Sequence, residues 1–155
     1  MKKLLAYIVT ILLLSACSSD AASSTKPSQP ESEKGSASMK LKIHVNDTTF
    51  TATLADNSSA KALVELLQKG DLTLDMEDFS NFEKVADLPV TLPRNDTPTD
   101  TDAGDLILYL GKRIVIYYDK NSWNFTRLGK IDNVNKKRLK QILGDGNATV
   151  TFSVK

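Results

Sequence analysis

The chain has 155 residues, of which 41% are hydrophobic and 25% are charged, a composition typical of a soluble domain. Its single cysteine and single histidine exclude a disulfide framework and any zinc or iron–sulfur site built from several cysteines. The 20 Lys and Arg residues balance 19 Asp and Glu, and the net charge of +1 argues against nucleic acid as a partner, since that binding needs a clustered positive surface.

Residues 1–16 predict a lipoprotein signal peptide. Two lysines precede an apolar run over residues 4–14, which is shorter than the roughly 20 residues that a membrane-spanning helix needs. Residues 14–17 read Leu-Ser-Ala-Cys and resemble the lipobox of bacterial lipoproteins, whose cysteine is lipidated and becomes the new N-terminus. We therefore expect lipid on Cys17 and an extracytoplasmic domain anchored to a bacterial membrane. A signal peptide cleaved before an unmodified Cys17 is the alternative.

Residues 17–39 predict a flexible tether. Between residues 18 and 38 the chain is rich in Ser and has no Val, Ile, Leu, Phe, Tyr or Trp, so this segment cannot bury enough apolar surface to offset the entropy of ordering. About twenty such residues span roughly 25 Å on average. The folded domain is therefore expected over residues 40–155, held at some distance from the bilayer.

The domain begins with an expected β-hairpin. Residues 40–46 and 50–54 alternate apolar and polar side chains, and turn-forming residues lie between them. The only histidine, His44, falls on the polar face. It is interpreted as solvated rather than catalytic or metal-binding, because no second ligand is in view.

The next expected element is a helix, followed by a less regular stretch. Side chains that can cap a helix at residues 56–59 precede apolar residues at helical spacing, and Gly70 closes the helix. Residues 71–76 alternate again, whereas residues 78–84 have no clean period. Residues 88–92 predict a short strand at a sheet edge, because a proline lies at each end.

Residues 94–103 predict a polar loop. Four aspartates crowd the loop and its end: Asp96, Asp100, Asp102 and Asp105. Clustered carboxylates suit calcium, but position twelve counted from Asp100 is Gly111 rather than the Glu of an EF-hand. A solvated acidic loop is the preferred interpretation, and no metal or cofactor is predicted.

The last part of the chain has the most regular pattern. Residues 105–110 and 113–118 predict a tight hairpin of two long strands, and residues 123–132 predict another strand. A short helix around residues 139–143 and a final strand over residues 148–154 follow. The expected fold is mainly β, a small closed barrel with one or two short α-helices, because closure removes exposed strand edges.

Several segments together resemble the bacterial cyclophilin-like domain family, in their order and spacing. They are residues 50–54, 57–60, 103–106, 108–111, 114–118 and 121–131. The resemblance covers residues 40–155. It implies a small β-barrel related in shape to cyclophilin, found in bacterial lipoproteins and beside flavodoxin-like domains, and it brings no established activity.

The resemblance also raises prolyl isomerisation as an alternative activity. True cyclophilins surround a proline pocket with a central Arg and with Phe, Gln, Trp and His residues, in motifs that this sequence lacks. Arg113 and Arg127 lie in hairpin contexts, and solvated strand positions account for both. No catalytic residue is assigned.

The candidate binding site rests on the resemblance and on loop position. Adjacent strand residues face opposite sides, so one of Tyr117 and Tyr118 should enter the core and the other should face outward. We place the candidate pocket at the end of the long hairpin. Its expected residues are Tyr118, Asn121 and Trp123, with Glu83 or Arg127 supplying charge. The expected function is a tethered module that binds a small ligand, a peptide or a partner protein, and a weak prolyl isomerase is the alternative.

Overall fold

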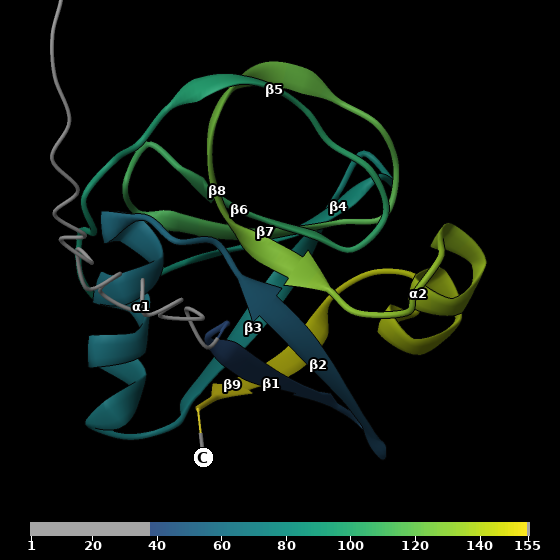
Figure 1. The fold of residues 1–155 in the computed structure, drawn as a ribbon. Coiled ribbons are helices and arrows are strands. Elements are labelled where there is room, and N and C mark those ends of the chain that lie inside the picture. Colours follow the sequence, from purple (N-terminus) through teal and green to yellow (C-terminus); the bar gives the residue numbers. More distant parts are fainter. Residues whose placement is uncertain (1–37, 155) are drawn as a thin grey trace, which may run out of the picture. The chain divides into compact units, whose positions relative to one another are not determined.

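The computed structural model describes residues 38–154, which fold into nine strands and two helices (Figure 1). The predicted signal peptide, Cys17 and nearly all of the predicted tether lie outside the described residues. In chain order the elements are β1 (Lys40–Val45), β2 (Thr48–Leu54), α1 (Ser58–Gln68), β3 (Leu72–Phe79), β4 (Glu83–Asp87), β5 (Thr97–Asp100), β6 (Asp105–Tyr109), β7 (Arg113–Tyr117), β8 (Ser122–Ile131), α2 (Lys136–Leu143) and β9 (Ala148–Ser153).

Eight of the strands form a closed antiparallel barrel. Their order is β2-β1-β9-β3-β4-β7-β6-β8, and β2 pairs back with β8. At this seam Leu54 lies opposite Gly129. A Cβ at position 129 would collide with the Thr53 carbonyl oxygen and lie 3.0 Å from the Leu54 Cα, so glycine is what allows the two strands to approach. The predicted mainly β, closed barrel is confirmed.

Alternating side chains fill the barrel interior. In β1 the residues Leu41, Ile43 and Val45 are buried while their neighbours are exposed. The same alternation on β2 and β9 brings Phe50 and Phe152 into one continuous core. Burial of this apolar surface is the main force that stabilises the barrel.

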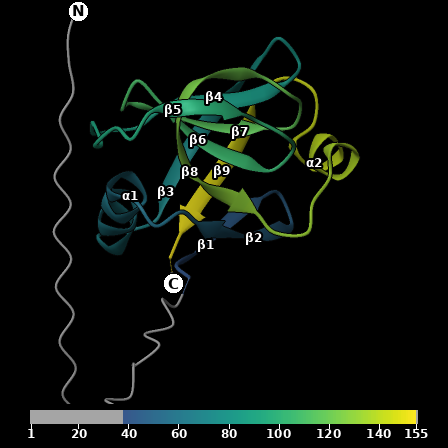
Figure 2. The ribbon, with the colours of Figure 1, turned by 45° about the horizontal axis from the view of Figure 1, so that its top comes forward.

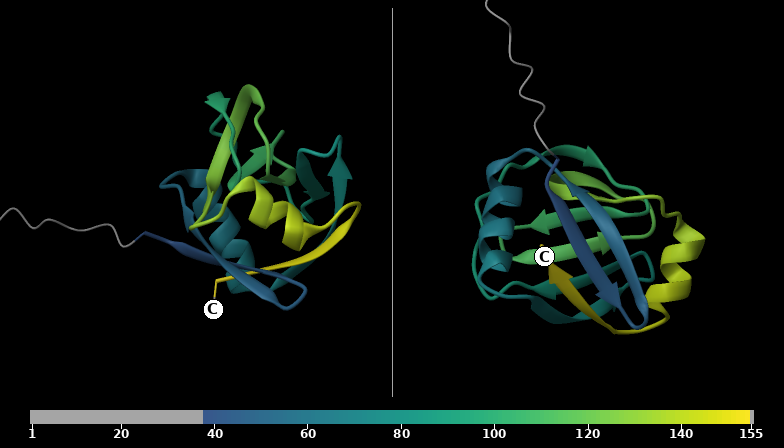
Figure 3. Two further views of the ribbon diagram at one scale, coloured as in Figure 1. Left: turned by 90° about the vertical axis from the view of Figure 1, so that its right-hand side faces the viewer. Right: turned by 60° about the horizontal axis from the view of Figure 1, so that its bottom comes forward.

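The two helices flank the barrel on opposite sides, as the right-hand view of Figure 3 shows. Asn57 caps α1 by accepting a 2.8 Å hydrogen bond from the Ala60 amide, and Asn135 caps α2 in the same way, from the Arg138 amide at 2.9 Å. Each helix buries leucines against the strands. Within residues 38–154, neither helix has the length and apolar character needed to cross a membrane.

One wall of the barrel is buried on both faces. In β6 and β7 nearly every residue is buried, whereas β1 alternates. β5 lies at the top of Figure 1, where it pairs with the first half of β8, and in Figure 2 it lies with β4, β6 and β7, away from β1 and β2. The outer face of the β4-β7-β6-β8 wall therefore carries a second apolar cluster.

Two sequence predictions for the middle of the chain were wrong. Residues 88–92 do not form a strand. Leu88 and Leu92 are buried, but their amides donate to the carbonyl oxygens of Lys112 and Gly111, each at 2.7 Å, so the segment is a loop attached to the β6–β7 turn. The strand lies earlier, at residues 83–87, and the predicted polar loop contains β5.

Candidate functional site

A cavity of about 370 Å³ opens on the outer face of the β4-β7-β6-β8 wall. Antiparallel register places Glu83 opposite Tyr117 and Val85 opposite Val115, with Ile107 of β6 next to Val115. Because side chains alternate along a strand, these residues share the outer face of the wall. The cavity is lined by Phe79, Phe82, Glu83, Val85, Tyr109, Arg113, Val115, Tyr117, Asn121, Trp123 and Phe125.

Aromatic rings form most of its walls and hold one another in place. The Phe82 ring stacks on Tyr117 with centroids 6.1 Å apart, and Tyr117 packs on Phe125 at 5.7 Å. Tyr109 meets the edge of Phe125 at 6.1 Å. At the mouth, Phe79 and Trp123 are 55% and 65% exposed, which is unusual for large apolar side chains. The cavity thus has a packed aromatic floor and an open aromatic rim.

The β3–β4 turn supplies two of these rings. Ser80 and Asn81 both have positive φ, and the Asn81 amide donates to the Asp78 carboxylate at 3.1 Å. The Phe82 carbonyl oxygen accepts from the Tyr118 amide at 3.0 Å. The turn is therefore fixed at both ends, which holds Phe79 and Phe82 over the wall.

Three polar side chains converge in the cavity. Asn121 donates to the Tyr117 hydroxyl at 3.2 Å, and Tyr117 lies opposite Glu83 in the β4–β7 pairing, where the two side chains interact. Glu83 is only 9% exposed, and its Oε2 has no hydrogen-bond partner among residues 38–154. Burial raises the pKa of Glu83, and the Tyr117 hydrogen bond opposes this only in part. Burial and the Glu83 hydrogen bond likewise raise the pKa of Tyr117.

The position of Asn121 is fixed by the neighbouring loop. The backbone N–H of Asn121 donates to the Thr101 hydroxyl at 2.9 Å, and the backbone N–H of Thr101 donates to the Asn121 carbonyl oxygen at 2.8 Å. Arg113 lies at the rim, and its Nε donates to Asp87 at 3.0 Å. The cavity's polar groups are thus preorganised, apart from the unpartnered oxygen of Glu83.

The structure brings together three of the five residues that the sequence suggested. Glu83, Asn121 and Trp123 all line the cavity. Tyr118 lies on the barrel side, almost fully buried, and its neighbour Tyr117 takes the position in the cavity. Arg127 does not line the cavity.

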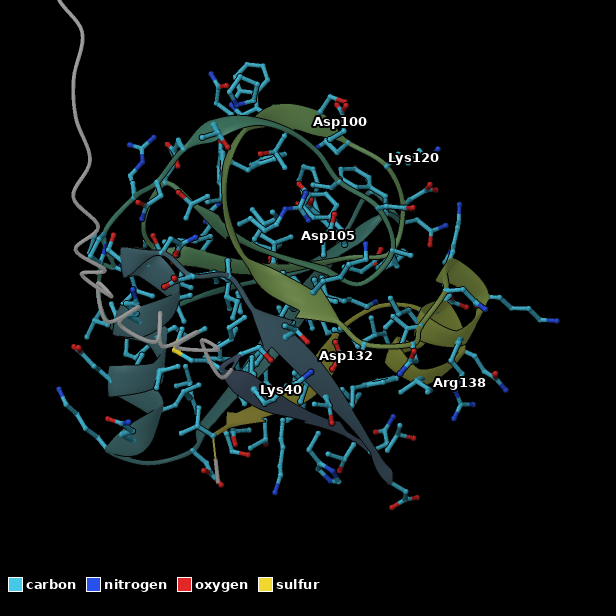
Figure 4. The ribbon with its side chains drawn as sticks, in the orientation of Figure 1. Lys40, Asp100, Asp105, Lys120, Asp132 and Arg138 are labelled. Atoms are coloured by element: carbon cyan, nitrogen blue, oxygen red, sulfur yellow. The ribbon has the colours of Figure 1, made fainter. Side chains whose placement is uncertain are left out.

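Arg127 instead contacts two aspartates, both labelled in Figure 4. It pairs with the buried Asp105 carboxylate and donates to the Asp100 carbonyl oxygen at 3.2 Å. Lys130 pairs with Asp105 as well, at 3.0 Å. Within the described range no three His, Cys, Asp or Glu side chains are arranged to hold a metal ion.

The sequence contained a signal for the residues that were missed. Val85 and Val115 line the cavity although they were not predicted to, and Arg113, considered from the sequence only in connection with prolyl isomerisation, lines it too. The β6 and β7 strands read Asp-Leu-Ile-Leu-Tyr and Arg-Ile-Val-Ile-Tyr, apolar runs without alternation. Such runs indicate strands that are buried on both faces, and they therefore predict that other side chains of the protein pack on the outer face of the β6–β7 hairpin.

The barrel side of the same wall carries a complete polar network. Lys84 is fully buried, and its ammonium group donates to Asp78 at 2.8 Å, to the Gly144 carbonyl oxygen at 3.0 Å and to that of Gly146. The Tyr118 hydroxyl donates to the same Asp78 carboxylate. Burial alone would raise the pKa of Asp78, but the hydrogen bonds from Lys84 and Tyr118 outweigh it and lower the pKa.

Comparison with known proteins agrees with this architecture. The chain is similar to a hypothetical protein of Archaeoglobus fulgidus with a solution structure, with a TM-score of 0.51 and 14% identity over 76% of this chain and 95% of the other. That likeness concerns the fold alone. No curated protein sequence matches the chain significantly. The model of the cyclophilin-like family matches residues 43–153, which is most of the chain, and the protein therefore belongs to the cyclophilin-like family.

Proposed function

We propose that the domain is a binding module that takes a small ligand, or one side chain of a peptide, into the cavity on the outer face of the β4-β7-β6-β8 wall. The carrying observation is the cavity itself: about 370 Å³, mostly aromatic, with a few polar groups that converge on it. Ligand sites in proteins have this size and this combination of apolar walls with a few placed polar groups.

The aromatic rim supports the same proposal. Phe79 and Trp123 are each more than half exposed, and both line the mouth. Burial of large aromatic side chains is favourable, and such side chains are enriched where proteins bind ligands and partners. An occupant of the cavity would cover both rings.

The sole tryptophan makes the proposal directly testable, because Trp123 lines the cavity. The full chain would be titrated with N-acetylated, amidated amino acids covering the side chains other than Trp, whose own emission would mask that of Trp123, while Trp123 fluorescence is followed. At least one should shift the emission saturably, and Phe79→Ala should weaken that binding. If no compound of the panel alters the emission, the cavity is not a site for peptide side chains, and the peptide form of the binding proposal fails.

We also propose that the chain is a lipoprotein held at an extracytoplasmic membrane face through Cys17. The support is the sequence of residues 1–17, with its two lysines, short apolar run and Leu-Ser-Ala-Cys motif. Several acyl chains on one cysteine would make the attachment stable. Cys17→Ser should move the protein from the membrane fraction to the soluble fraction, and unchanged partitioning would contradict the anchor.

Catalysis of prolyl isomerisation is less well supported. It would require an arginine that donates into the apolar cavity, and Arg113 is the arginine at the rim. Its Nε is engaged by Asp87, and both side chains are more than half exposed. A proline-peptide isomerisation assay on the full chain decides the matter. If the protein accelerates isomerisation and Arg113→Ala abolishes this acceleration, the domain is an enzyme and not only a binding module.

A further inference from the structure

The Glu83 carboxyl group is the unusual feature of the cavity. It is nine-tenths buried, and Oε2 has no hydrogen-bond partner within residues 38–154. A buried carboxylate without a compensating charge or full hydrogen bonding costs free energy, and for this reason such groups are rare in folded proteins. Glu83 lies among the aromatic side chains that line the cavity. One oxygen of Glu83 is therefore free to accept a hydrogen bond from a group that enters the cavity.

No basic residue of the described part of the chain neutralises Glu83. The adjacent Lys84 points to the barrel side and is bound to Asp78. Arg113 lines the cavity but pairs with Asp87. The negative charge of an ionised Glu83 would therefore be compensated only by a positive group that enters the cavity from outside.

The aromatic walls of the cavity also favour a positively charged group. Phe79, Phe82, Tyr109, Tyr117, Trp123 and Phe125 all line the cavity. The faces of aromatic rings attract cations, and cages of aromatic rings recognise ammonium groups such as choline. A neutral apolar ligand would fit the rings but leave Glu83 uncompensated. An anionic ligand would be repelled by both.

We infer that the cavity is a site for an organic cation, in which an ammonium or guanidinium group lies against the aromatic rings and neutralises Glu83. This inference rests on the proposed binding function and names its ligand class. The cation could belong to a free amine or to the Lys or Arg side chain of a peptide, since both present the same charged group.

The test compares cations with neutral molecules of the same shape. Choline would be paired with 3,3-dimethylbutan-1-ol, and N-acetyl-lysine amide with N-acetyl-norleucine amide, each titrated into the full chain with Trp123 fluorescence as the readout. We expect the cation of at least one pair to bind about tenfold or more tightly than its neutral counterpart. Binding of choline would indicate a free amine, and binding of the lysine derivative alone would indicate a peptide; either result supports the inference.

Glu83→Gln keeps the shape of the side chain and removes its charge. It should lower the affinity for the cation about tenfold and leave the affinity for the neutral counterpart unchanged. Glu65→Gln is the matched control, because Glu65 is exposed on α1 and no residue of α1 lines the cavity. Should Glu83→Gln fail to fold, Phe79→Leu at the exposed rim keeps an apolar side chain but removes the ring, and should weaken the cation more than the neutral compound.

The outcomes separate the two proposals. If neutral counterparts bind as tightly as cations, or if Glu83→Gln leaves the cation affinity unchanged, the inference is overturned and the binding function stands. If neither member of either pair changes Trp123 emission, the inference is overturned. The binding function is then decided by the wider panel of amino-acid derivatives.

Discussion

The two faces of the β4-β7-β6-β8 wall carry similar residues but differ in how completely their polar groups are hydrogen-bonded. Glu83 and Lys84 are neighbours in sequence, as are Tyr117 and Tyr118, and each pair sends one side chain to each face. On the barrel side Lys84, Tyr118 and Asp78 satisfy one another. On the outer side the Glu83 carboxyl keeps an oxygen without a partner. A complete buried network stabilises a fold, whereas a buried polar atom without a partner costs free energy.

The largest contrast should come from removing one aromatic ring on each side. Phe152 is fully buried in the barrel core and Phe79 is 55% exposed at the cavity mouth. Phe152→Ala should lower the free energy of unfolding by about 4 kcal/mol, because it leaves a cavity in a packed core. Phe79→Ala should change it by no more than about 0.5 kcal/mol. Urea denaturation measures both, and equal losses would show that the rim ring is part of the core.

Removing the buried ammonium group should have the next largest effect. Lys84→Met keeps the apolar stem but leaves Asp78 and the carbonyl oxygens of Gly144 and Gly146 without their donor. We expect a loss of about 3 kcal/mol in urea denaturation. Lys61→Met removes the exposed ion pair with Asp56 and should leave the denaturation midpoint unchanged within error. A midpoint for Lys84→Met equal to that of this control would contradict the structural role of the inner network.

Deleting one hydroxyl at each adjacent tyrosine sharpens the contrast further. Tyr118→Phe removes a hydrogen bond to the Asp78 carboxylate and should cost about 2 kcal/mol. Tyr117→Phe removes the hydroxyl that accepts from Asn121, next to a Glu83 carboxyl group that already has one oxygen without a partner. It should cost about 1 kcal/mol or less. Thermal or urea unfolding of the two variants side by side gives the order, and the reverse order would mean that the outer network holds the wall together.

The smallest expected effect is a difference in pH dependence. The pKa of Glu83 is raised by burial, so its contribution to stability is present below the ordinary Glu pKa and is lost as pH rises through the folded value. The pKa of Asp78 is lowered, because its hydrogen bonds outweigh burial, so its contribution is present above the ordinary Asp pKa and is lost as pH falls through the folded value.

Unfolding free energies measured from acid to neutral pH test these opposite signs. Relative to the parent protein, Glu83→Gln should gain stability as pH rises, whereas Asp78→Asn should lose it. Glu77→Gln, at an exposed position on β3, is the control and should follow the parent curve. Two variants with slopes of the same sign would show that the faces do not differ in the way proposed.

The barrel could be predicted from the sequence because most of its strands have one wet face. Leu41, Ile43 and Val45 alternate cleanly, and so do the residues of β9. Period two also predicted that Tyr117 and Tyr118 face opposite sides, which the structure confirms. The choice between the two faces depends on pairing with β4 and β6, which the local sequence does not contain.

The candidate site was harder to predict because its wall breaks the usual alternation. Lys84 looks like a surface residue in sequence, yet it is fully buried through partners up to 62 residues away. Strand β4 could not be predicted from its sequence, because it begins with a buried glutamate and a buried lysine and therefore shows no alternation of apolar and polar residues. Leu88 and Leu92, by contrast, mimic a strand while their backbone belongs to a loop.

Strand β5 has a bearing on how copies of the protein behave at high concentration. It is the end strand of the sheet order and pairs with β8 on one side only, so within the described residues it presents the free edge next to the barrel. An open edge invites another chain to add a strand. Here Pro98 has no N–H to donate, β5 is only four residues long, and Asp100 adds a charge at its end. These features of β5 disfavour the addition of a strand from another chain at the edge beside the exposed Trp123.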